Sequence, residues 1–173
     1  MTSRPEAHAA FAVDGVVRVE GVVTAGEARA MRDAVLAAID GWPLIELAGA
    51  LRPGPGSEAM LWAIGQQPVF APLAAGLARA ADEVFGAGAW APVAGEHGGL
   101  AAPNFPLADR AWDVPDRAWH VDEPTAAGQA VSWGLLGFAF LDEVVAGGGA
   151  TVAIAGSHRR LLALADAQGL APV

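Results

Sequence analysis

The sequence predicts an α+β protein in which helices come first and strands second. Up to about residue 89, capping residues precede stretches with helical periodicity. From Trp90 onward the pattern changes to short apolar runs separated by Gly, Pro, Asn and Asp, which is typical of strands and loops. A chain of 173 residues that is 54% hydrophobic can bury one core. We therefore expect a single domain over residues 1–173, mainly helical at 1–89 and strand-rich at 90–173.

Local signals place the elements of the first part. Residues 16–23 are rich in valine and predict a short strand. Thr24 and Glu27 have the spacing of a capping box before a helix over residues 28–39, whose apolar positions fall on one face. Ser57 can cap a helix that begins at Glu58. A further helix over residues 72–85 is expected to end at Gly86.

Composition and charge exclude several classes of partner. The formal charge of −9 and the isoelectric point near 4.7 oppose binding to nucleic acid or to anionic membrane surfaces. No cysteine is present, so any metal site must use histidine and carboxylate ligands. The N-terminus lacks a signal peptide pattern, and the apolar run at 130–141 is too short to cross a bilayer. We expect a cytoplasmic protein that acts on a small molecule.

The strongest local motif is Trp119-His120-Val121-Asp122. Alternate residues of a strand point to one face, so His120 and Asp122 would be presented together. An imidazole and a carboxylate suit Fe(II), and a second histidine would complete a facial triad with open coordination positions. The structural alternative is a histidine that is hydrogen-bonded to a neighbouring carboxylate.

Three other histidines could supply the missing ligand. His8 is expected in a frayed terminus, and His97 in a solvated loop beside two glycines. His158 follows Gly156-Ser157 after a predicted strand, and from spacing alone it is the obvious third ligand. A cupin-like metal site that uses His120, Asp122 and His158 is therefore one hypothesis.

A series of landmarks in the second part resembles the phytanoyl-CoA dioxygenase family of Fe(II) and 2-oxoglutarate dependent dioxygenases. The landmarks are the motif at 119–122, an apolar run that ends in Leu141-Asp142-Glu143, a glycine-rich turn at 147–149, and Gly156-Ser157-His158-Arg159. The resemblance implies a double-stranded β-helix, a jelly roll of the cupin type, with the N-terminal helices packed outside it. It implies that His120 and Asp122 bind iron and that 2-oxoglutarate is the co-substrate.

The same resemblance implies further roles. The Gly-Ser-His segment of the family marks the end of a strand, so His158 is expected to point away from the metal. The distal histidine, and the arginine that pairs with 2-oxoglutarate, come in a later strand and are expected beyond Val173. Phe138 matches a region where the family places an aromatic residue near the co-substrate. The β-helix is therefore expected to be incomplete at its C-terminal end, with open strand edges.

The function implied by the resemblance is hydroxylase-type oxidation of a small organic substrate, whose identity depends on loops that differ among family members. The alternative is a non-catalytic, degenerate member that keeps the scaffold but cannot anchor 2-oxoglutarate. The sequence leaves the oligomeric state open.

Overall fold

The computed structural model describes residues 4–47, 50–90, 99, 101–105, 119, 136–144 and 150–169. These residues belong to two compact units. The terminal unit comprises Met1–Arg18, Asp116–Phe138 and Val152–Val173, and the central unit comprises Val19–Pro115 and Ala139–Thr151. None of the helices in the described part of the chain is long and apolar enough to span a membrane.

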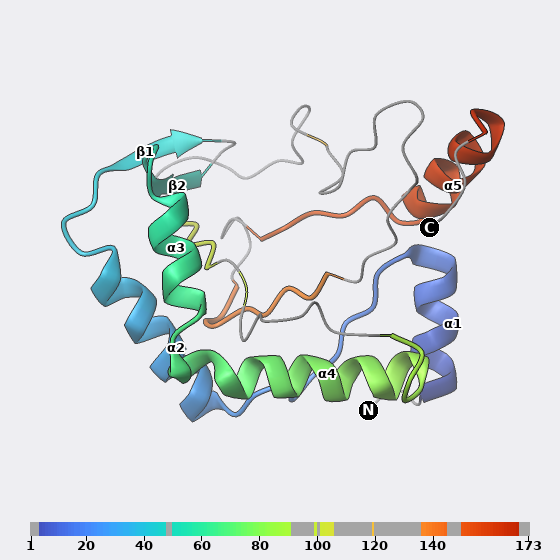
Figure 1. Cartoon of the computed structure of the whole chain (residues 1–173), viewed down its shortest axis with the longest axis horizontal. Coiled ribbons are helices and arrows are strands. Elements are labelled where there is room, and N and C mark those ends of the chain that lie inside the picture. Colours follow the sequence, from blue (N-terminus) through green and yellow to red (C-terminus); the bar gives the residue numbers. More distant parts are fainter. Residues whose placement is uncertain are drawn as a thin grey trace. The chain divides into compact units, whose positions relative to one another are not determined.

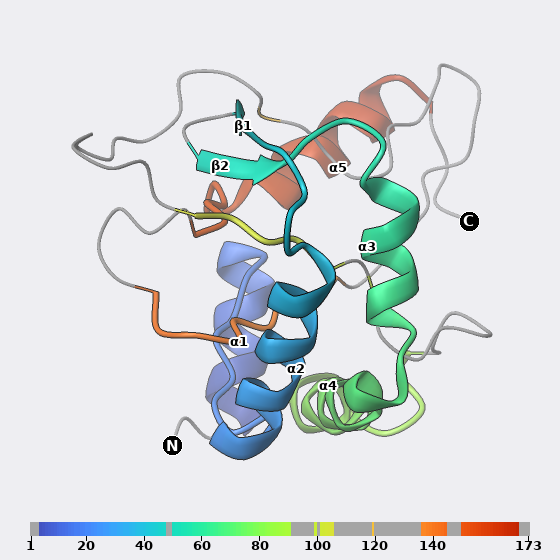
Figure 2. The same cartoon turned by 90° about the vertical axis from the view of Figure 1, so that its left-hand side faces the viewer.

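Helices dominate the described part of the central unit (Figures 1 and 2). Its elements are α2 (Ala25–Ala38), β1 (Leu44–Leu47), β2 (Ala50–Pro53), α3 (Glu58–Gly65), the 3-10 helix η1 (Pro68–Phe70) and α4 (Ala71–Phe85). Figure 2 shows α2 and α3 standing side by side, with α4 viewed almost end-on beside them. The bounds of α3 and α4 confirm the helices expected from Ser57 and from residues 72–85, and Gly86 ends α4 with a φ of 100°.

One apolar cluster holds these helices together. Met31, Val35 and Ile39 repeat along one face of α2 at helical spacing. They pack with Leu61 and Ile64 of α3 and with Phe70 of η1, and all six side chains are buried. Partly buried side chains surround this cluster, and Leu141 from the second half of the chain is one of them.

A reciprocal capping box starts α2, as the sequence predicts. The Thr24 hydroxyl oxygen accepts a hydrogen bond from the Glu27 amide at 3.2 Å, and the Glu27 carboxylate accepts one from the Thr24 amide at 2.8 Å. The Thr24 amide, and after it the Thr24 hydroxyl, lower the pKa of Glu27. A lowered pKa means that this carboxylate stabilises the fold above its unfolded pKa of about 4.3, and that the contribution is lost as the pH falls through the lower folded value.

The Thr24→Ala substitution is expected to lower the free energy of unfolding by about 1 kcal/mol at neutral pH, because the Glu27 amide loses its only capping acceptor. Urea denaturation measures this difference. The matched control is Thr24→Ser, which keeps the hydroxyl and is expected to stay close to wild type. An equal loss in both variants would assign the effect to the Thr24 methyl group and not to the cap.

The hairpin β1–β2 is short and antiparallel. Leu44 pairs with Pro53, and the register continues to Leu47 opposite Ala50. On its other side Leu51 exchanges two backbone hydrogen bonds of 2.9 Å with Phe105, which forms an isolated bridge. The sequence did not predict this hairpin. Phe105, which comes from the second half of the chain and bridges to β2, packs against the core cluster.

The terminal unit contains α1 (Arg4–Asp14) and α5 (Ser157–Ala167). The end of α1 meets the start of α5: the Gly156 amide donates a hydrogen bond of 2.8 Å to the carbonyl of Asp14. Gly156 has a φ of 73°, a left-handed conformation that favours glycine. This turn directs the chain into α5.

Several sequence predictions differ from this structure. His8 lies within α1, so the prediction of a frayed terminus is wrong. Residues 16–23 form no strand. Residues 136–141 and 150–154, where strands were expected, are neither helix nor strand. The strand predicted to carry His120 and Asp122 lies outside the described residues, as does His97, and the double-stranded β-helix stays a prediction.

Candidate functional site

The predicted iron ligands His120 and Asp122 lie outside the described residues. Their neighbour Trp119 is described, and its side chain is partly exposed. Among the residues that the structure describes, no group of three or more histidine, aspartate or glutamate side chains lies close enough to hold a metal ion. The metal prediction therefore rests on the motif itself.

His158 takes part in the contact between α1 and α5. It is the second residue of α5, and its Nε2 lies 3.3 Å from the carbonyl oxygen of Ala12. That carbonyl belongs to the last turn of α1, where backbone acceptors have no partner within the helix. With Nε2 protonated, the ring donates to this acceptor and so joins the two helices.

The other nitrogen of His158 is covered. Its Nδ1 is buried and has no hydrogen-bond partner. The ring lies against Gly15, where the φ is 73° and where a Cβ atom would overlap the imidazole. Neither ring nitrogen is therefore presented to a cation in this structure. The Gly-Ser-His segment was expected to end a strand, but it begins α5.

Phe138, the residue expected near the co-substrate, lies in the stretch 136–140 and is 57% exposed. It does not line the hollow of the central unit described next. The structure therefore leaves Phe138 on the surface.

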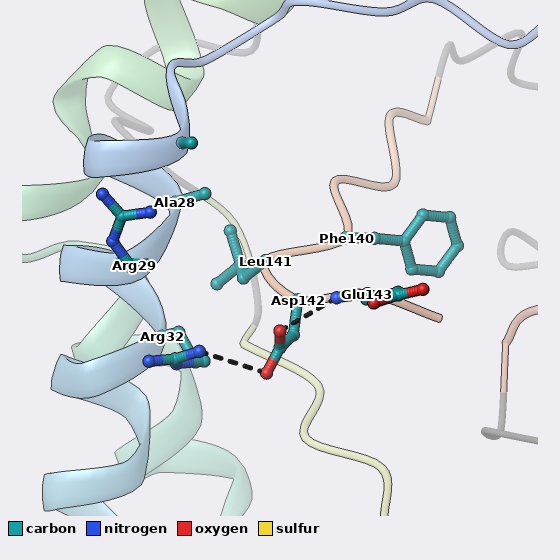
Figure 3. A pocket seen from close by; sticks show the side chains of 8 residues that line it. Ala28, Arg29, Arg32, Phe140, Leu141, Asp142 and Glu143 are labelled. Carbon is teal, nitrogen blue, oxygen red and sulfur yellow. Dashed lines mark hydrogen bonds and ion pairs between the residues drawn. The ribbon is translucent and has the colours of Figure 1, made fainter. Parts of the chain in front are cut away.

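An open hollow of about 320 Å³ lies between α2 and residues 140–143 of the central unit (Figure 3). It is lined by Ala25, Ala28, Arg29, Arg32, Phe140, Leu141, Asp142 and Glu143. Leu141 and Asp142 point toward α2, whereas Phe140 points to the opposite side (Figure 3). The hollow thus lies at the contact between residues 140–143 and α2, and we call this contact the junction.

An ion pair crosses this junction. Arg32 Nη1 lies 3.3 Å from Asp142 Oδ2, and Arg32 Nη2 lies 3.0 Å from Asp33 Oδ1. Asp33, and after it Asp142, raise the pKa of Arg32. Both carboxylates are exposed, so solvent screens these interactions and their contribution to stability is small. No sequence signal identified a pair that is 110 residues apart.

The polar groups of the hollow do not converge on one point. The Arg32 guanidinium is occupied by its two carboxylates, and Asp142 Oδ1 accepts a hydrogen bond of 2.9 Å from the Glu143 amide. Arg29 does not point toward Asp142 or Glu143 (Figure 3). A ligand site requires convergent polar groups in a concave pocket, and this hollow lacks them.

Comparisons with family models, with curated proteins and with solved structures find no match to this chain.

Proposed function

We propose that this protein binds Fe(II) through His120 and Asp122 and is of the 2-oxoglutarate dependent dioxygenase type, acting on a small organic substrate. The observation that carries the proposal is the Trp119-His120-Val121-Asp122 motif, followed in order by Leu141-Asp142-Glu143 and Gly156-Ser157-His158. This order of landmarks resembles the phytanoyl-CoA dioxygenase family. The double-stranded β-helix and a place for Phe138 beside the co-substrate belong to the same proposal.

The chemistry of the two donors fits the metal. A neutral imidazole and a carboxylate are the ligand types that Fe(II) takes in the facial triad. The chain contains no thiolate that would favour a softer metal. In this type of site the iron, with 2-oxoglutarate and O₂, supplies the oxidant for hydroxylation. The role of His120 and Asp122 is to hold the cation while leaving coordination positions open.

His158 is not part of the proposed site. Its Nε2 is engaged with the Ala12 carbonyl, and its Nδ1 is buried against Gly15. Ligation through His158 would require the ring to leave the contact between α1 and α5. This observation favours the two-residue site over the cupin-like alternative with three ligands.

Metal titration of the 173-residue chain tests the proposal. Binding of Mn(II), a redox-stable probe for Fe(II), is measured by calorimetry without co-substrate. We expect weak binding in the wild type, because two protein ligands hold the cation, and a loss of affinity of about tenfold or more in His120→Ala and Asp122→Asn. The matched control is His158→Ala, whose affinity is expected to equal that of the wild type.

Two results would contradict this assignment. Unchanged affinity in both His120→Ala and Asp122→Asn would remove the metal site. Loss of binding in His158→Ala, with native helix content, would show that His158 is the third ligand. Succinate formation with Fe(II) and 2-oxoglutarate is a separate readout, and we expect it to be low, because His158 is engaged with the Ala12 carbonyl and is not presented as a third ligand.

A further inference from the structure

A histidine joins the two terminal helices of the chain within the terminal unit. The Gly156 amide, directly before α5, donates a hydrogen bond of 2.8 Å to the carbonyl of Asp14. His158, in the first turn of α5, places Nε2 3.3 Å from the carbonyl oxygen of Ala12. Both acceptors belong to the last turn of α1, whose carbonyl groups lack a partner within the helix. We call this pair of hydrogen bonds the α1–α5 contact.

The α1–α5 contact determines which ring nitrogen of His158 carries the proton. A carbonyl oxygen only accepts, so the proton lies on Nε2. A neutral imidazole has one N–H, and its Nδ1 then holds a lone pair. This Nδ1 is buried and has no hydrogen-bond partner among the described residues, and the ring lies against Gly15. The α1–α5 contact therefore suits the neutral ring.

A second proton would change the ring in two ways. Nδ1 would become a donor, and the imidazole would carry a positive charge. Within the α1–α5 contact this donor would be buried without an acceptor, which is unfavourable, and so is the burial of an unpaired charge. When α5 separates from α1, water solvates both nitrogens. The second proton therefore binds preferentially to a ring that has left the contact.

No ion pair offsets this preference. The charged groups beside the contact are Asp14 at the end of α1 and Arg159 and Arg160 at the start of α5, and the Arg159 side chain lies next to Gly156. In the described part of the chain, no carboxylate forms an ion pair with the His158 ring. The carboxyl end of α1 attracts a cation, whereas the amino end of α5 repels it, so the two helix ends partly cancel. The buried Nδ1 therefore decides the preference.

We propose that the α1–α5 contact is a pH-sensitive latch, which is closed while the His158 ring is neutral and opens when the ring takes a second proton. Opening of the latch frees α5, the C-terminal helix, from α1, the N-terminal helix. The central unit keeps its fold, because its core cluster is apolar and contains no histidine. Acid therefore loosens the terminal unit selectively.

The pH range of the latch is separate from that of the capping box. A conformation that binds more protons is favoured as the pH falls, and here that conformation is the open latch. An unperturbed histidine changes its charge between about pH 8 and about pH 5. The Glu27 carboxylate of the capping box loses its contribution only below about pH 4.3. Acidification to about pH 5 should therefore open the latch without unfolding α2.

Hydrogen exchange of single amides tests the latch, followed by NMR on the metal-free protein and corrected for intrinsic exchange rates. In the wild type the protection of the Gly156 amide should fall by about tenfold or more between about pH 7.5 and about pH 5. The Val35 amide inside α2 should stay equally protected. His158→Gln keeps an N–H donor but takes no proton, so the protection of its Gly156 amide should not change. The matched control is His8→Gln on α1, which should respond to pH as the wild type does.

Nitrogen NMR of the wild-type imidazole is the second measurement, and at about pH 7.5 we expect the single proton of His158 on Nε2. Three outcomes would overturn the proposal: a proton on Nδ1 at this pH, constant protection of the Gly156 amide in the wild type, or an equal loss of protection in His158→Gln. The first two are measured on the wild type, so they do not depend on the folding of a variant. The inference does not rest on the iron proposal, since both measurements are made without metal.

Discussion

Met31→Ala is expected to lower the free energy of unfolding by about 2–5 kcal/mol, because Met31 is the centre of the core cluster and its side chain is 0% exposed. The lost side chain would leave a cavity among Val35, Leu61 and Phe70, which can relax only in part. A domain is typically stable by about 5–15 kcal/mol, so this change removes a large share of the total. Urea denaturation followed by circular dichroism measures the loss.

The matched control for Met31→Ala is Leu36→Ala on the same helix. Leu36 lies on the outer face of α2 and is partly exposed, so its truncation is expected to cost less than about 1 kcal/mol. A similar loss in both variants would contradict the arrangement of α2 in which only one face contacts α3 and η1.

Gly76→Ala is expected to destabilise the protein by about 1–3 kcal/mol, although alanine is the better helix former. Gly76 lies inside α4 and is buried, and a Cβ atom there would overlap the backbone carbonyl of Val22. The same carbonyl accepts a hydrogen bond of 3.1 Å from Arg79 Nη2. The new Cβ atom is fixed to the backbone of α4, and the atom that it meets belongs to the backbone of Val22, so no side-chain rotation relieves the overlap. α4 would have to move away and lose its contact with Val22. Thermal or urea unfolding gives the difference.

Gly26→Ala is expected to raise the free energy of unfolding, in contrast to Gly76→Ala. Gly26 is also helical, near the start of α2, but a Cβ atom there would meet only the Thr24 hydroxyl, at 3.9 Å. That is an ordinary contact, so the gain in helix propensity of up to about 1 kcal/mol should appear as added stability. If Gly76→Ala stabilised the protein as Gly26→Ala does, the close approach between α4 and Val22 would be wrong.

Predictions based on local signals succeeded where the signal and the contact lie within one turn. Thr24 and Glu27 form the expected capping box, and α3 begins at Glu58 as expected. Ser57 precedes α3 but makes no side-chain cap hydrogen bond, although it is buried. The residue type of Ser57 therefore predicted where α3 begins. Whether the Ser57 side chain forms a cap hydrogen bond depended on the packing around Ser57.

The helix α5 shows how a resemblance can outweigh local propensity. Its sequence is rich in Leu, Ala and Arg, which are strong helix formers, and propensity alone would have favoured a helix. The resemblance instead predicts that Gly156-Ser157-His158 marks the end of a strand. His158 contacts the Ala12 carbonyl, and this contact gives the ring a structural role. The two residues are 146 positions apart, so no local sequence pattern indicates the contact.

The metal motif is a different case, because its interpretation depends on sequence alone. The side chains of His120 and Asp122 are ligand types for Fe(II), and their spacing matches the period of a strand. Both residues lie outside the described part of the chain. The pair stays a prediction, and the titration of its variants is the direct test.

By itself the sequence determined the capped helices of the central unit and the apolar face of α2, because caps and helical periodicity depend on residues only three or four positions apart. Only the tertiary structure decided what the extended segments pair with. The valines of residues 16–23 favour an extended backbone, but the Val22 carbonyl meets Gly76 and Arg79 of α4 and not another strand. Strand pairing needs a distant partner, and a partner is chosen by the packing of the whole unit and not by the segment itself.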